Sequence, residues 1–310
     1  MFGRTVEDMT VVTWDSLRAA EHFVMRSARL VDRYRFEHLF RNGSVEPVRS
    51  ALAAYRNIDG GYGNGLDPDL RGHSSQPAAT AIALSHLDEL GHIPLDLGHD
   101  VCRHLSTVTN PDGGLPPIRS SVRHTEAAPR LRQLDDFSSD LALTASITGY
   151  LYKHHITHPW RDGATAYCWK HINALHWTEP RQAIGVCTFL QNVPDRERAV
   201  AALDRLRPMI RASIGTHPAF ETRQRVHTVL DLATGPDHIA RPLFTDAEIE
   251  RNLDFFEKAQ REDGGWDAIA PHWGTAATLE HEGMRTIHCM SVLDAYGRVG
   301  TLLPRPRSDR

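Results

Sequence analysis

Apolar residues recur along most of the chain at the spacing of an α-helix. Leu143, Ile147 and Leu151, for example, are four residues apart and share one helix face. No stretch shows the sustained alternation with β-branched residues that is typical of a half-buried strand. The pattern predicts an all-α fold of about eleven or twelve helices. The predicted helices cover residues 16–40, 44–56, 77–91, 95–107, 138–155, 162–175, 180–192, 195–212, 217–232, 246–260 and 284–298.

Short breaker pairs such as Gly-Gly, Asn-Pro and Gly-Pro separate these helices. The chain contains no long linker rich in proline or serine and no low-complexity segment. We therefore expect one compact domain over residues 13–300, with flexible ends at residues 1–12 and 301–310.

The composition is that of a globular protein, with 41% hydrophobic and 24% charged residues in a chain of 310. The apolar runs are too short to span a bilayer, and the segment MFGRTVEDMT lacks the apolar stretch of a secretion signal. A net charge of −4 argues against general binding to nucleic acid or membrane surfaces. The four dispersed cysteines are expected to be reduced thiols, which predicts a cytoplasmic protein.

Asp-Gly-Gly followed by an apolar or aromatic residue occurs three times in the sequence. The copies are Asp59-Gly60-Gly61-Tyr62, Asp112-Gly113-Gly114-Leu115 and Asp263-Gly264-Gly265-Trp266. Their spacing predicts a repeated unit of two helices and the connecting loops. The alternative is that three unrelated helices each end in glycine, the residue most often found just past a helix C-terminus.

The third copy reads Q-x-x-x-G-x-W from Gln260 to Trp266, which resembles the QW repeat of squalene–hopene cyclases and other class II terpene cyclases. Residues 45–92 and 245–299 resemble repeats of protein prenyltransferase β subunits, in which a Gly-Gly turn precedes a Thr-led helix. Both families share an α/α toroid of six inner and six outer helices with the active site in its centre. The resemblance implies a single toroid of this kind.

The zinc site of prenyltransferase β subunits does not carry over to this sequence. The resemblance places their ligand His before a Thr on the last inner helix, where this chain has Arg285 before Thr286. His288 and Cys289 are adjacent and point about 100° apart on a helix, which makes them poor co-ligands. Although 19 histidines leave metal binding open, we predict no metal site and no cofactor.

Class II terpene cyclases protonate an alkene with the central Asp of a D-x-D-D motif, and such an acid must be held protonated. The sequence here is Gln133-Leu134-Asp135-Asp136. The resemblance implies that Asp135 is the proton donor and Asp136 its partner. The alternative is that Asp135, Asp136 or Ser138 caps the helix that begins near residue 138.

The loop over residues 64–76 offers a rival acid. Asp67 and Asp69 lie two residues apart beside Arg71, and paired carboxylates next to an arginine can form an acid–base pair or a clamp for a polar substrate. Tyr62, which precedes this loop, and Arg71 and Gln76 within it are predicted to bind substrate. The alternative is a solvated turn rich in capping residues.

The segment after Trp266 forms a second cluster. Its predicted substrate-binding residues are Trp266, His272, Trp273, His281 and Arg285, and Glu280 is a further candidate acid. The tryptophans can stabilise a developing carbocation by cation–π attraction, or Trp266 can simply pack between helices. We expect the segments that follow the three Asp-Gly-Gly turns to converge on one rim of the ring.

These features predict an enzyme that resembles class II terpene cyclases, a lyase or isomerase. It would carry out acid-initiated cyclisation or rearrangement of a small, partly apolar molecule in a central cavity. One alternative is carboxylate and histidine acid–base catalysis on a polar or sugar-like substrate, since toroids host several chemistries. Another is a non-catalytic binding protein. An apolar cavity with a protonated Asp favours the first, a polar lining the second, and a filled ring the third.

Overall fold

The computed structural model describes residues 14–215, 227–269 and 273–299. Within these ranges the chain forms thirteen α-helices and no strand, which confirms the all-α prediction. The helices are α1 (Trp14–Ser27), α2 (Leu30–Arg41), α3 (Glu46–Ala53), α4 (Pro77–Glu89), α5 (Leu95–Val108), α6 (Pro129–Arg132), α7 (Leu141–Lys153), α8 (Pro159–Asn173), α9 (Pro180–Asn192), α10 (Arg196–Ser213), α11 (Val229–Leu232), α12 (Asp246–Lys258) and α13 (Thr275–Ala295). The ends predicted to be flexible lie outside the residues described.

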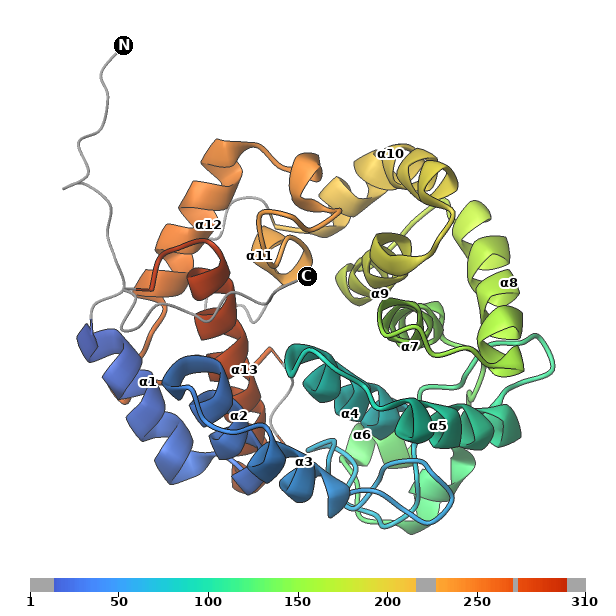
Figure 1. Ribbon diagram of the computed structural model, residues 1–310, viewed down its shortest axis with the longest axis horizontal. Helices are drawn as coiled ribbons and strands as arrows, with labels where there is room; N and C mark the ends of the chain where they lie inside the picture. The colour runs from blue at the N-terminus through green and yellow to red at the C-terminus, as the bar shows by residue number, and fades with distance from the viewer. Residues whose placement is uncertain (1–13, 216–226, 270–272, 300–310) are drawn as a thin grey trace.

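The helices follow one another around a ring (Figure 1). Helices α4, α7, α9 and α13 lie nearer its centre, and α5, α8, α10 and α12 lie outside them. Helix α7 packs against α4, α8 and α9, so neighbouring pairs are joined through their inner members. The first helix, α1, packs against the last, α13, and these contacts close the ring.

The predicted helix over residues 16–40 is two helices. Arg29 between them is extended, with φ −66° and ψ 159°, so the chain leaves the helical conformation there. Its Nε donates to Asp32 in the first turn of α2 at 2.7 Å, which fixes the start of the second helix. Helix α2 then ends at Asn42, which is left-handed at φ 53°.

One other predicted boundary is wrong. The last helix, predicted from residue 284, begins at Thr275, because the threonine- and alanine-rich segment before Glu280 continues the helix. In the segment predicted as a helix over residues 217–232, the described part contains only the short helix α11, and residues 217–226 lie outside the described ranges. The four-residue helix α6 is too short to give a periodic signal.

The three Asp-Gly-Gly turns have the same geometry. The first glycine of each has φ of +89°, +91° or +92°, and the Asp side chain of each accepts from the N–H of the second glycine at 2.9–3.0 Å. Glycine adopts such a φ without the steric cost that a Cβ would bring. The turns connect α3 to α4, α5 toward α7, and α12 to α13.

A threonine anchors each turn to the inner helix that follows. The N–H groups of Tyr62, Leu115 and Trp266 donate to the hydroxyls of Thr80, Thr144 and Thr286 at 3.1, 3.0 and 3.2 Å. Because three unrelated helix ends would not share this cross-link, the turns are copies of one structural unit.

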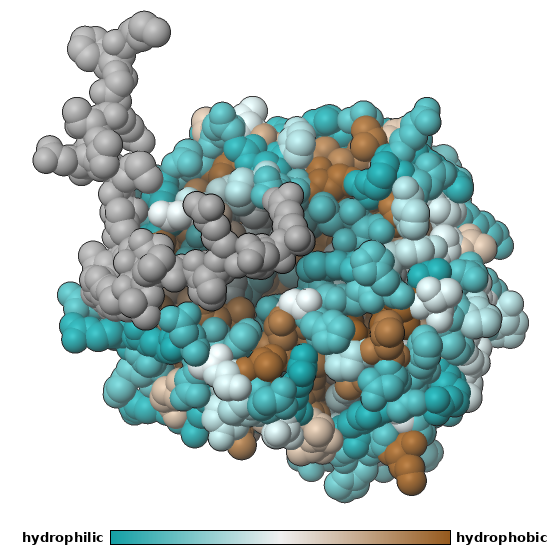
Figure 2. All heavy atoms as spheres, viewed as in Figure 1, coloured by the Kyte–Doolittle hydropathy of each residue, from teal (hydrophilic) through white to brown (hydrophobic). Residues whose placement is uncertain are grey.

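Hydrophilic residues dominate the face of the molecule that Figure 2 shows, and hydrophobic residues appear there as separate small groups. Within the described ranges no helix is both long and apolar enough to cross a membrane.

Candidate active site

A cavity of about 560 Å³ lies within the ring, lined by α4, α6, α7, α9, α13 and the loops before them. Most of its wall is aliphatic, and Tyr150 is the tyrosine in it. We call it the apolar cavity. Its apolar lining residues are Pro68, Ala78, Ala81, Ile82, Pro117, Ile118, Leu131, Leu134, Ala142, Leu143, Ile184 and Met284.

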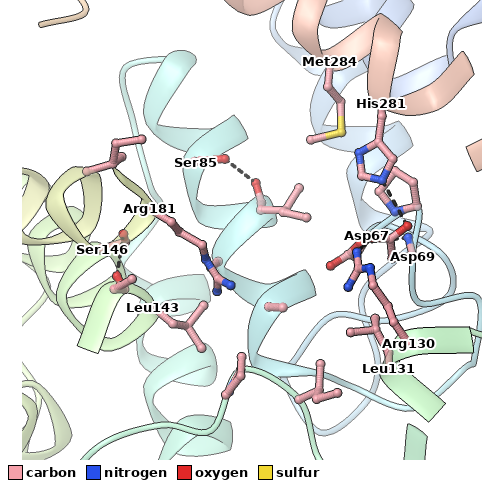
Figure 3. Close-up of a pocket in the computed structure, with 18 of the residues that line it drawn as sticks. Asp67, Asp69, Ser85, Arg130, Leu131, Leu143, Ser146, Arg181, His281 and Met284 are labelled. Atoms are coloured by element: carbon pink, nitrogen blue, oxygen red, sulfur yellow. Dashed lines mark hydrogen bonds and ion pairs between the residues drawn. The ribbon is translucent and has the colours of Figure 1, made fainter. Parts of the chain in front are cut away.

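Two carboxylates lie at one side of this cavity. Figure 3 shows Asp67 and Asp69 together with Arg130 and His281, across the cavity from Leu143, Ser146 and Arg181. The backbone N–H of Asp69 donates to Oδ1 of Asp67 at 2.9 Å. This local turn holds the two carboxyl groups close together at the cavity wall.

Asp69 is held as a carboxylate. Nε1 of Trp273 donates to its Oδ1 at 2.8 Å, Nε2 of His281 lies 3.2 Å from the same oxygen, and Arg130 pairs with its Oδ2. Burial opposes the charge, but the hydrogen bond and charge of His281, with Arg130 and Trp273, outweigh it and lower the pKa of Asp69. Asp69 therefore stays ionised.

The pKa of Asp67 is shifted in the opposite direction, upward. Burial raises the pKa of this carboxyl, and the negative charge of Asp69 raises it further, against the hydrogen bond from the Asp69 backbone and the charge of His281. Two neighbouring carboxyls whose pKa values are driven apart give one proton donor and one carboxylate. The arrangement favours a proton on Asp67 rather than on Asp69, beside an aliphatic wall.

A second cavity of about 560 Å³ shares Ser85, Arg130, His281 and Met284 with the first, so the two are adjacent. We call it the polar cavity. Its other lining residues are Arg35, His86, Glu89, His227, Ala268, Ile269, Arg285 and His288.

Asp231 organises one wall of the polar cavity. It lies on α11, where its carboxylate accepts from the Thr228 N–H at 2.7 Å in a capping box. Arg285 donates to it, and Nε2 of His288 lies 3.1 Å from Oδ1. Burial alone would raise the pKa of Asp231, but the charge of Arg285 and the hydrogen bond from His288 hold it well below its usual range.

Asp135 and Asp136 line neither cavity. The Asp135 side chain is 95% exposed and pairs with Arg123 at 2.6 Å. Asp136 accepts from the Ser138 N–H at 2.8 Å, and Asp140 is the residue that caps α7. The alternative that Asp135, Asp136 or Ser138 caps this helix is therefore wrong, because the helix begins at Leu141 and Asp140 is its N-cap.

Three predicted substrate-binding residues are structural in their contacts. Tyr62 is 1% exposed and packs in the core, and Trp266, equally buried among core residues, donates from Nε1 to the Phe256 carbonyl at 2.8 Å. The Gln76 side chain contacts the segment before α6. Its Nε2 donates to the Ser121 hydroxyl at 3.1 Å, and its Oε1 accepts from the Arg119 N–H at 2.8 Å. None of the three lines either cavity.

The remaining candidates lie close to the paired carboxylates. Glu280 and Arg71 form an ion pair at 2.9 Å, which connects the loop of Asp67 to α13. Neither residue lines either cavity. His281 and Arg285 line the cavities, and Trp273 contacts Asp69 directly. His272 lies outside the described residues.

Sequence reasoning missed several residues of the site. They are Arg130, His86, Asp231 and Arg181. Arg130 stands in the sequence Pro129-Arg-Leu-Arg, which follows the second Asp-Gly-Gly turn and so offered a positional signal. The segments after all three turns do reach the apolar cavity, through Asp67, Ile118 and His281.

No protein-family model and no curated protein matches the sequence. Among solved structures, a protein from Actinoplanes is similar with a TM-score of 0.57 at 13% identity, covering 91% of this chain and 99% of that one. A variant of the type II terpene cyclase MstE from Scytonema, in complex with its substrate geranylgeranyl dihydroxybenzoate, has a TM-score of 0.53 at 11% identity. The alignment covers 92% of this chain and 97% of MstE. The chain therefore has a fold like that of a type II terpene cyclase.

Proposed function

We propose that this protein catalyses acid-initiated cyclisation or rearrangement of an isoprenoid in the apolar cavity, with Asp67 as the proton donor. The observation that carries the proposal is the Asp67–Asp69 pair, in which a carboxyl with a raised pKa borders an aliphatic wall. The likeness to MstE, whose substrate bears a geranylgeranyl chain, supports this class of substrate. Asp67 replaces Asp135 as the favoured acid.

In the proposed reaction the O–H bond of Asp67 breaks and a C–H bond forms at one carbon of an alkene. The alkene π electrons supply the new bond, and the other carbon becomes a carbocation, which a second alkene attacks to close a ring. A C–H bond next to the cation then breaks, its electrons form a new C=C bond and its proton passes to solvent, so the product is an isomer of the substrate. Asp67 regains a proton from solvent. The carboxylates of the pair attract the positive charge as it develops.

Positioning is the role we propose for the groups around Asp69. Trp273, His281 and Arg130 hold Asp69 ionised, and its charge keeps the proton on Asp67. The aliphatic wall excludes water that would otherwise capture the cation.

We also propose that the ring has six inner and six outer helices. The inner set would be α2, α4, α7, α9, α11 and α13, and the outer set α1, α3, α5, α8, α10 and α12. Contacts of α2 with α3, α4 with α5, α7 with α8, α9 with α10, α11 with α12 and α13 with α1 support this pairing.

The polar cavity favours a second candidate function, which is acid–base catalysis on a polar or sugar-like substrate. Glu89, Arg285 and four histidines line it and can bind hydroxyl groups. A sugar substrate would leave the aliphatic wall beside Asp67 unused, so we place this candidate second.

Reaction in D₂O separates the two candidates. We expect geranylgeranyl dihydroxybenzoate or a simpler isoprenoid to give an isomer that carries one deuterium from Asp67. Asp67→Asn is expected to lower kcat by about 10²–10⁴-fold, the usual contribution of a general acid. Asp135→Asn is the matched control and should keep wild-type activity, because its carboxylate is exposed. Unchanged turnover in Asp67→Asn would refute the assignment.

A further inference from the structure

His86 has no hydrogen-bond partner although it is buried. It lies on α4, its exposed fraction is 1%, and neither Nδ1 nor Nε2 has a partner. The nearest acidic oxygen, Oδ1 of Asp32, is 4.0 Å from Nε2. Buried polar groups in folded proteins are nearly always hydrogen-bonded, so an unpaired imidazole that lines a cavity indicates a missing ligand.

The surroundings of His86 keep its ring neutral. Arg35 pairs with Asp32 and with Glu89, both at 2.7 Å, and Arg29 pairs with Asp32 at the same distance. Burial and the charge of Arg35 lower the pKa of His86 well below its usual value, against the attraction of Asp32. A neutral imidazole offers one N–H donor and one acceptor nitrogen. A hydroxyl group, which both donates and accepts, complements it.

The arginines of the polar cavity are already neutralised by carboxylates. Arg285 pairs with Asp231, Arg130 with Asp69, and Arg35 with Asp32 and Glu89. A diphosphate needs cationic donors that carry uncompensated charge, and its own charge would lie close to Glu89. The electrostatics of this cavity therefore oppose a diphosphate and accept an uncharged polar group.

The two cavities can hold two parts of one molecule. Ser85 and Met284 line both of them, and the Asp67–Asp69 pair borders the apolar one. A chain in the apolar cavity would meet the acid while its polar end lies beside His86.

We infer that the substrate is an isoprenoid with an uncharged, hydroxyl-bearing head group that hydrogen-bonds His86 in the polar cavity, rather than a prenyl diphosphate. The inference names the substrate class of the proposed function and rests on it. His86 is a specificity-determining residue in this assignment, and the acid remains Asp67.

Calorimetric binding of matched ligands tests the head group without requiring turnover. The probes are farnesol, farnesyl diphosphate and the hydrocarbon with the same chain. We expect farnesol to bind at least about tenfold more tightly than either of the others, since one hydrogen bond is worth about that factor. Tighter binding of the diphosphate than of the alcohol would overturn the inference.

Two variants assign the difference to His86. His86→Leu removes both polar atoms and should abolish the preference for farnesol over the hydrocarbon, leaving hydrocarbon binding unchanged. His86→Gln keeps a donor and an acceptor and should retain part of the preference. If His86→Leu fails to fold, the comparison of ligands on the wild-type protein still decides the inference. Unaltered farnesol affinity in a folded His86→Leu variant would contradict it.

Deuterium incorporation from D₂O distinguishes failure of the inference from failure of the proposed function. If farnesol binds preferentially and no isoprenoid acquires deuterium, the head-group assignment stands and the acid-initiated reaction is wrong. If isoprenoids acquire deuterium with no dependence on the head group, the reaction stands and the head-group assignment is wrong.

Discussion

Asp67 and Asp69 are two residues apart in the chain, yet the pKa values of their carboxyl groups are shifted in opposite directions. The difference comes from their partners, because Asp69 receives hydrogen bonds from Trp273 and His281 and an ion pair from Arg130. Asp67 accepts a hydrogen bond from the backbone N–H of Asp69, and its pKa is raised by burial and by the charge of Asp69. The chemistry of each carboxyl is therefore set by residues from other parts of the chain.

This dependence explains why the sequence pointed first to Asp135. The sequence alone does not show whether the side chains of neighbouring acidic residues are exposed to solvent or buried. Asp135 is exposed, and Asp67 borders the cavity, because helices distant in sequence cover one and not the other. The sequence did bring Asp67, Asp69 and His281 into the candidate set. It gave no signal for His86, whose lack of a partner is a property of the folded chain.

The buried Asp32 gives a pH-dependent contribution to stability. Burial opposes its charge, but Arg29 and Arg35 lower its pKa from 3.8 to about 2. A depressed pKa stabilises the folded state above the unfolded pKa, and this stabilisation is lost as pH falls from about 4 toward 2. The contribution is about 2 kcal/mol. We expect the free energy of unfolding, measured with urea, to fall over this range.

Two variants check this prediction. Asp32→Asn removes the titrating group, so its unfolding free energy should depend less on pH below about 4. It should also lose about 3–5 kcal/mol near neutral pH, because buried Arg29 loses its carboxylate partner and Arg35 keeps only Glu89. Asp135→Asn should keep the wild-type slope, and an equal slope in Asp32→Asn would show that Asp32 is not the group responsible.

At the scale of whole elements, periodicity predicted most of the helices correctly. Helices α4, α9 and α10 lie within three residues of the predicted ranges, because each carries an apolar stripe bounded by proline or a capping residue. The break at Arg29 was missed, because the periodicity continues through it, and the contacts that hold Arg29 there include a long-range one with the Leu66 carbonyl. Short elements such as α6 depend on tertiary contacts and leave no periodic trace.

Two of the Asp-Gly-Gly turns can be compared by replacing the first glycine of each with alanine. Gly113 and Gly264 have nearly the same φ, +91° and +92°, so an alanine at either position has a similar backbone cost of about 1–2 kcal/mol. Their surroundings differ. A Cβ on Gly264 would lie 2.0 Å from the Ala19 carbonyl oxygen, whereas the nearest atom to a Cβ on Gly113 is 3.6 Å away.

We therefore expect Gly264→Ala to lose about 1–3 kcal/mol more than Gly113→Ala in urea unfolding, since overpacking against the α1 backbone adds to the shared φ cost. Gly113→Ala is the matched control for the φ contribution. Equal losses would mean that α1 moves aside without cost and that the close approach at Gly264 is not tightly packed.

At the scale of the whole molecule, the ring brings segments from both ends of the chain to one site. Gln260 donates to the Ser16 carbonyl at 2.9 Å, Arg261 stacks over Phe23, and α13, which carries His281, packs on α1 and α2. The closed ring was predicted through the resemblance of its repeats, and could not be derived from helix periodicity alone. What the closure produces is a cavity lined both by Asp67 from an early loop and by His281 from the last helix.

If the apolar cavity generates a carbocation as proposed, it should bind a stable cation of the same shape. We expect an isoprenoid quaternary ammonium ion to raise Tm, and at one hundred times its Kd the stabilisation is about 2.7 kcal/mol. The uncharged hydrocarbon of the same shape should give a smaller shift, because it lacks the attraction to the carboxylates. Thermal unfolding across a series of ligand concentrations measures both.

The pH dependence of this binding identifies the acid. Because the pKa of Asp67 is raised, the free protein holds a proton there that the bound cation displaces. Binding coupled to proton release tightens as pH rises and levels off once Asp67 is already ionised in the free protein. Asp67→Asn should bind the ammonium ion more weakly and with little pH dependence, whereas Asp135→Asn should behave as wild type. The same pH slope in Asp67→Asn would assign the released proton to another group and remove Asp67 from the acid's role.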